Sequence, residues 1–140
     1  MKKVFSFVLV CLVVCLFAAC GSEGQTQDID VDLTKLSSTM VYSEVYNMLT
    51  SPDPYLGKTV RMKGQFATYE DPQSGIVYFA CVIDDATACC SQGLEFVLEG
   101  TYTYPDDYPS LGTEISVTGE FRTYTEGNNL YCHLIHATME

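Results

Sequence analysis

Two segments of the chain repeat one pattern of apolar residues and glycines, and this repeat constrains the fold most strongly. Residues 57–69, GKTVRMKGQFATY, and residues 112–124, GTEISVTGEFRTY, carry apolar side chains at alternate positions on both sides of a central glycine. Such alternation predicts strands with one buried face. The central glycines, Gly64 and Gly119, mark bulges or sharp bends. The repeat therefore predicts two long, bent strands of one β-sheet.

Three further segments have strand patterns, and one has a helix pattern. The strand segments are residues 75–84, 94–100 and 130–139, each bounded by turn residues. Apolar residues at helical spacing precede all the strands: Val41, Val45, Met48 and Leu49. Pro52 follows them as a stop. We expect a mainly all-β domain with one N-terminal helix, in which strong bending lets five strands close into a small barrel.

The N-terminus has the layout of an export signal. Lys2 and Lys3 precede the apolar run VFSFVLVCLVVCLF and the sequence FAAC, which places small residues directly before Cys20. A cysteine at the cleavage position is typical of bacterial lipoproteins, in which that thiol carries the lipid. The apolar run is shorter than the ~20 residues of a spanning helix. We predict a lipoprotein signal at residues 1–19, lipidation of Cys20 and a location at the extracytoplasmic face of the cell membrane.

The rest of the chain divides into a tether and one domain. Residues 20–36 are polar and acidic without apolar periodicity, which predicts a flexible tether, and residues 37–140 form the predicted domain. The formal net charge of −11 repels phosphate backbones, so we expect no nucleic-acid partner. The expected partners are the membrane, through the lipid, and a membrane transporter or another envelope protein. The domain itself is expected to be a monomer.

The strand pattern resembles the OB-fold, a five-stranded Greek-key barrel, over residues 55–139. The glycine-bent strands correspond to its first and fourth strands, and residues 101–111, TYTYPDDYPSL, replace its usual helix. More narrowly, CVIDDATACCSQGLEF is similar to segments of poorly characterised bacterial lipoproteins and of the OB-like subunit of a permease associated with zinc-regulated genes. The resemblance implies metal chemistry at Cys89 and Cys90, and less directly at Cys81. In that subunit, however, the Cys-Cys and Asp-Ala pairs stand in a different order.

Besides Cys20, the predicted mature chain has four cysteines: Cys81, Cys89, Cys90 and Cys132. Adjacent cysteines bond to each other only through a strained ring, so Cys89 and Cys90 need other partners. Zinc takes four ligands, and the candidates for the remaining ones are Cys81, Asp84, Asp85, Cys132 and His133. An exported location also permits disulfides, and Cys81 and Cys132 could instead be small core residues. The sequence leaves a zinc site, disulfides and packing as three open interpretations.

A tyrosine-rich loop is the second candidate site. Tyr102, Tyr104 and Tyr108 lie around two aspartates in residues 101–111. OB-folds stack bases or sugars on aromatic side chains near the barrel mouth. The acidic flanks favour a sugar, a peptide or a basic protein over nucleic acid. Alternatively, the tyrosines only cover the open end of the barrel.

Catalytic motifs are missing from the sequence. It contains no nucleophile elbow, phosphate loop or HExxH motif, so we expect no enzyme. The expected function is an anchored OB-fold binding or adaptor lipoprotein that binds zinc through the vicinal cysteine pair. The alternatives are a disulfide-stabilised structural or protein-interaction lipoprotein without metal, and a binder of a small ligand or sugar that uses the tyrosine loop.

Overall fold

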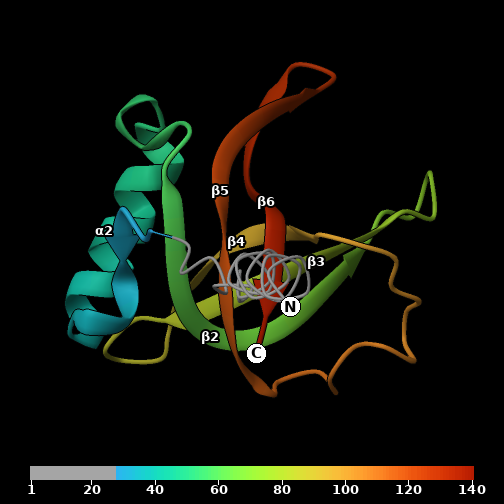
Figure 1. Cartoon of the computed structure of the whole chain (residues 1–140), viewed down its shortest axis with the longest axis horizontal. Helices are drawn as coiled ribbons and strands as arrows, with labels where there is room; N and C mark the ends of the chain where they lie inside the picture. The colour runs from blue at the N-terminus through green and yellow to red at the C-terminus, as the bar shows by residue number, and fades with distance from the viewer. Residues whose placement is uncertain (1–27) are drawn as a thin grey trace, which may run out of the picture.

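The computed structural model of the protein describes residues 28–140. The predicted signal at residues 1–19, the lipidation site Cys20 and the first part of the predicted tether lie outside this range. Within it the chain is mostly β, with six strands in one sheet and one α-helix beside them (Figure 1). None of the helical segments in residues 28–140 is long and apolar enough to cross a membrane.

The predicted strand segments all form strands. The long strands are β2 (Thr59–Glu70), β3 (Val77–Asp84), β4 (Ser91–Leu98), β5 (Glu114–Glu126) and β6 (Asn129–Met139). The helix, α2 (Ser38–Thr50), ends before Pro52, as its pattern predicts. It buries Val45 and Met48 as predicted, but Leu49, which the pattern placed on the same apolar stripe, is 39% exposed. Residues 101–113 contain turns and no helix, also as predicted.

The folded part begins earlier than the sequence predicts. Residues 28–36, which were expected to belong to the tether, contain the two-residue strand β1 (Val31–Asp32) and the 3-10 helix η2 (Leu33–Lys35). β1 pairs in parallel with β2, which makes the sheet six-stranded rather than five-stranded. Leu33 is only 1% exposed. The predicted domain boundary at residue 37 is therefore too late, because such short elements carry no periodic signal.

The pairings of the long strands close into a ring. β2 pairs with β3 and with β5, β3 with β4, β4 with β6, and β6 with β5. All of these pairs are antiparallel except β4 with β6. β2 reaches two neighbours because it curves strongly, so that its first half lies against β5 and its second half against β3 (Figure 1).

The two central glycines lie where backbones approach closely. A Cβ at Gly64 would collide with the main-chain carbonyl oxygen of Val82 on β3. A Cβ at Gly119 would lie 3.0 Å from the carbonyl oxygen of Ile135, next to a shift in the register of β5 and β6. The predicted bend and bulge are thus confirmed at these positions, since only glycine lets the strands come this close.

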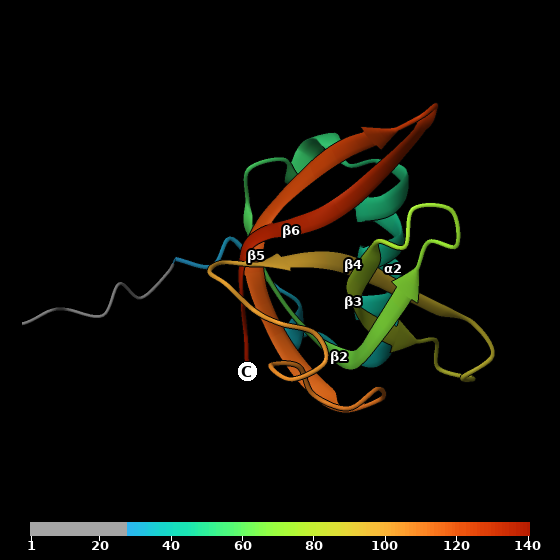
Figure 2. The ribbon, with the colours of Figure 1, turned by 90° about the vertical axis from the view of Figure 1, so that its right-hand side faces the viewer.

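The core lies inside the ring and extends to α2. Fully buried side chains come from all five long strands and the helix: Val45, Met48, Val60, Met62, Phe66, Cys81, Leu94, Phe96, Val117, Phe121 and Leu134. In Figure 2, α2 lies behind the strands and the long segment between β4 and β5 runs in front of them. The candidate sites lie at the β3–β4 turn, which is at the surface, and next to the core beneath the β4–β5 segment.

Candidate functional site

The turn between β3 and β4 carries the vicinal cysteines at the surface. The Asp85 amide donates to the Cys90 carbonyl oxygen at 2.9 Å, and the Ala88 amide donates to the Asp85 carbonyl oxygen at 3.0 Å. Ala88 has a φ of 53°, which turns the chain back toward β4. Cys89 and Cys90 are exposed, and Asp85 is half-buried. The turn therefore folds the two thiols back over the Asp85 carboxylate.

One oxygen of Asp85 is held by the backbone of this turn, and the other faces a thiol. Oδ1 accepts hydrogen bonds from the amides of Thr87 and Cys89, both at 3.0 Å. The Cys89 amide is the main reason that the pKa of Asp85 is held below its usual value. Cys89 Sγ lies 3.7 Å from Asp85 Oδ2 and 3.4 Å from Cys90 Sγ. Among residues 28–140, these three side chains place one potential metal-ligand atom each within 4.8 Å of one another.

These spacings fit a tetrahedral zinc ion. Zinc–sulfur and zinc–oxygen bonds of about 2.3 and 2.0 Å place two sulfurs about 3.8 Å apart, and a sulfur and an oxygen about 3.5 Å apart. The observed 3.4 Å between the two sulfurs and 3.7 Å between Cys89 Sγ and Asp85 Oδ2 come close to these values. The hydrogen bond with Cys89 raises the pKa of the Cys90 thiol, so an incoming metal ion has to displace a proton.

The other predicted ligands lie elsewhere. Cys81 on β3 is fully buried and Cys132 on β6 is 9% exposed, and both belong to the core. Burial raises the pKa of Cys81 to about 12, which disfavours the thiolate that a metal needs. His133 packs on Tyr124, with 4.6 Å between ring centroids, and burial lowers the pKa of His133. All four cysteines of the described chain are free thiols. Of the five predicted additional ligands, only Asp85 lies in one cluster with Cys89 and Cys90.

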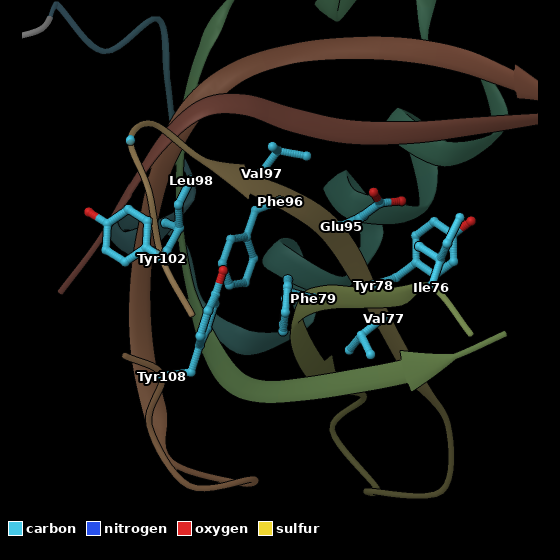
Figure 3. Close-up of a pocket in the computed structure, with 11 residues that line it drawn as sticks. Ile76, Val77, Tyr78, Phe79, Glu95, Phe96, Val97, Leu98, Tyr102 and Tyr108 are labelled. Carbon is cyan, nitrogen blue, oxygen red and sulfur yellow. The ribbon is translucent and has the colours of Figure 1, made fainter. Parts of the chain in front are cut away.

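The tyrosine loop covers a gap in the ring of strands. β3 and β4 pair only from Ala80 with Glu95 to Asp84 with Ser91. Before Ala80, β3 pairs with β2, and from Glu95 onward β4 pairs with β6. The two strands therefore diverge. A cavity of about 300 Å³ lies where residues 77–79 and 96–98 separate (Figure 3).

Aromatic side chains surround one end of this cavity. Tyr108 stacks on Phe79, with ring centroids 4.2 Å apart, and Tyr104 lies 5.5 Å from Phe79. Tyr102 meets Tyr108 edge to face at 6.2 Å, and Phe96 lies 6.4 Å from Phe79. The structure thus brings the three predicted tyrosines together. It adds Phe79 and Phe96, which sequence reasoning had not proposed for a ligand site.

A carboxylate marks the other end. Glu95 lies with Tyr78 at the end of the cavity away from Tyr102 and Tyr108 (Figure 3). The Tyr124 hydroxyl donates to Glu95 Oε2 at 2.5 Å, and burial raises the pKa of Glu95. The ion pairs of the described chain are those of Lys35, Lys63 and Arg122, and none of them includes Glu95. Sequence reasoning missed this residue, although an acid inside the apolar segment LEFVLEG was a usable signal.

Comparison with models of known protein families and with curated protein sequences gave no match to this chain. Functional inference therefore depends on the chemistry of two places in the structure. The first is the cluster of Asp85, Cys89 and Cys90 at the β3–β4 turn. The second is the aromatic cavity that ends at Glu95.

Proposed function

We propose that this chain is a membrane-anchored OB-like lipoprotein that binds a thiophilic metal ion, with zinc as the first choice, on the extracytoplasmic face of the cell. The observation that carries the metal assignment is the cluster of Asp85, Cys89 and Cys90, whose ligand atoms lie within 4.8 Å of one another. Two sulfurs and one oxygen suit zinc, and the sulfurs alone would also suit Cu(I). The fourth zinc position is left to water or to a group from a partner protein.

The order of strand pairing supports the OB-like assignment. The ring runs β2, β3, β4, β6 and β5, with a parallel contact between β4 and β6. This order of pairing is the one expected of an OB-fold, a five-stranded Greek-key barrel that is partly open. The divergence of β3 and β4 fits that description, because β3 before Ala80 and β4 after Glu95 are not paired with each other. β1 and α2 are additions outside the ring.

The proximity of the ligand atoms to each other also supports a role for Asp85. Its Oδ1 is fixed by two backbone amides, so Oδ2 can approach a metal with the loss of only its 3.1 Å hydrogen bond from the Thr87 hydroxyl, which also donates to Oδ1. Hydrogen bonds of this kind orient the side chains that bind a metal directly, and they strengthen metal binding. The site is exposed, which would let a partner such as a membrane transporter or envelope protein exchange the ion or complete its coordination.

The first expected result is zinc binding by the reduced protein at one ion per chain. The Cys89→Ser, Cys90→Ser double variant should lose more than about 100-fold in zinc affinity, because the cluster then contains no thiolate. Binding should weaken as the pH falls, since protons then compete with zinc for the thiols, and the raised pKa of Cys90 strengthens this competition at neutral pH. Competition with a chromogenic chelator and elemental analysis of the reduced protein measure both effects.

A matched pair of aspartate variants tests the carboxylate. Asp85→Asn should weaken zinc binding about 10-fold while it retains the turn, because an amide oxygen can accept the same backbone hydrogen bonds. Asp84→Asn is the control, since the Asp84 carboxylate accepts a hydrogen bond from the Ser91 hydroxyl and is not in the cluster. Zinc affinity no tighter than micromolar in the parent, or equal in the double serine variant, would contradict the metal assignment. Intact mass with and without reductant then tests the disulfide alternative.

The anchor is tested at Cys20. Cys20→Ser should move the protein from the membrane fraction to the soluble fraction or leave it unprocessed, because acyl chains supply about 0.8 kcal/mol of membrane affinity per buried CH₂. Cys15→Ser, inside the apolar run, should change neither processing nor location. Cell fractionation measures the location of the two variants, and labelling with a fatty acid measures their lipidation. Normal processing and full membrane retention of Cys20→Ser would refute the lipoprotein assignment.

A further inference from the structure

The cavity between β3 and β4 has the features of a small-molecule site. Its volume of about 300 Å³ is at the lower end of the range for such sites, and its walls are mainly apolar. Phe79, Phe96 and Tyr108 form a packed aromatic wall, and Tyr102 extends it from the loop. The cavity arises from the strand pairing itself, since β3 and β4 separate beyond Ala80 and Glu95.

The charge in the cavity is uncompensated within the described chain. Glu95 receives one hydrogen bond, from Tyr124, and has no basic partner in residues 28–140. Tyr78, beside it, already donates its hydroxyl to Glu126 at 2.7 Å. The surroundings of Glu95 therefore combine carboxylates with the faces and edges of aromatic rings. A positive ligand group would therefore find a counter-charge at Glu95.

We propose that this cavity binds a small organic cation, in which a primary ammonium group is carried on an aromatic or branched apolar body. The body lies between Phe79, Phe96 and Tyr102, and the ammonium lies at Glu95. This site is separate from the cluster at Cys89 and Cys90, and the proposal does not depend on metal binding.

Three physical effects favour such a ligand over the alternatives. A charge-assisted hydrogen bond from ammonium to carboxylate is about twice as strong as a neutral one. Tyrosine and phenylalanine faces attract cations by a further ~0.5–2 kcal/mol. The formal net charge of −11 raises the local concentration of cations and repels anions. A neutral sugar is less favoured, because it brings no positive charge to Glu95, although the hydroxyls of Tyr102 and Tyr108 in the cavity lining could bind its own hydroxyls.

A set of matched ligands tests the proposal on the full chain, with detergent alone as the blank. The probe is phenethylamine, and 2-phenylethanol and phenylacetate are its neutral and anionic counterparts. We expect phenethylamine to bind at least about 10-fold more tightly than 2-phenylethanol, which corresponds to about 1.4 kcal/mol, and phenylacetate to show no binding. Calorimetry, or NMR shifts of residues lining the cavity, measures the dissociation constants.

Two variants, Glu95→Gln and Tyr102→Ala, separate the roles of charge and of ring, and two further variants are controls. Glu95→Gln should weaken phenethylamine about 10-fold and leave 2-phenylethanol unchanged, because the amide keeps the shape of the side chain without its charge. Glu99→Gln removes the same charge from an exposed position outside the cavity lining and should change binding less than two-fold. Tyr102→Ala should weaken both ligands. The Cys89→Ser, Cys90→Ser variant should bind phenethylamine like the parent.

Several outcomes would overturn the proposal. One is equal affinity for phenethylamine and 2-phenylethanol, and another is no binding of either ligand. A third is equal loss in Glu95→Gln and Glu99→Gln. Blocked lysine, Nα-acetyl-lysine methylamide, should bind more weakly than phenethylamine because it lacks the aromatic body. Equal affinity would mean that the aromatic body contributes nothing to binding and would refute the proposed class of ligand.

Discussion

Leu33→Ala should destabilise the domain by about 2–5 kcal/mol, although the residue lies in a segment that looks like a tether. Leu33 is 1% exposed, and the flanking strand β1 pairs with Val60 and Arg61 of β2. Loss of its side chain removes buried apolar surface and leaves a cavity, and both effects favour the unfolded state. Chemical denaturation of a chain that starts at residue 28 measures the change in the free energy of unfolding.

Leu111→Ala is the matched control for this prediction. Leu111 is 63% exposed, so its substitution should cost less than about 0.5 kcal/mol. A chain that starts at residue 37 lacks β1 and Leu33 together and should be at least as unstable as Leu33→Ala. If Leu33→Ala and Leu111→Ala cost the same, residues 28–36 do not belong to the folded unit.

Gly64→Ala should cost about 3 kcal/mol, because the added methyl group has no room. Its Cβ would collide with the Val82 carbonyl oxygen and lie 3.0 Å from Cys81 Sγ. Both neighbours belong to β3, so relief requires β2 and β3 to separate at the bend that lets β2 pair on two sides. The midpoint of thermal unfolding should fall by roughly 10–20 °C in a domain of this size.

Gly127→Ala provides the comparison. Gly127 has a φ of 59°, and no atom lies within 4 Å of the position of an added Cβ. Alanine there meets only the backbone cost of the left-handed conformation, about 1–2 kcal/mol. Equal unfolding midpoints for Gly64→Ala and Gly127→Ala would mean that β2 and β3 do not approach as closely as described.

Local sequence signals were sufficient for the five long strands and the α-helix. The period-two pattern predicted the five long strands, the helical spacing of Val41, Val45 and Met48 predicted α2, and Pro52 marked its end. The prolines of the tyrosine loop correctly excluded a helix there. These signals are readable because alternation, helical spacing and proline act on neighbouring residues within one element.

The candidate sites needed contacts between elements. Cys89 and Cys90 stood out in the sequence, but five residues competed to join them, and only the turn geometry brought Asp85 to the thiols. Glu95 was not among the sequence candidates, and it alternates with the buried Leu94 and Phe96 along β4. Its position at a cavity follows from the divergence of β3 and β4, which depends on β4 pairing with β6 far along the chain.

The end of β6 illustrates the same limit. Strand alternation from Cys132 and Leu134 predicts an inward His136, but His136 is exposed and Ala137 is buried instead. His136 has a φ of 49°, and two residues of β6 stand opposite Gly119 alone, which makes a bulge that reverses the alternation. Sequence by itself determined which segments form the long strands and the α-helix, because those preferences are local. Only the tertiary structure decided which side chains meet, because pairing partners, register and bulges are set by distant parts of the chain.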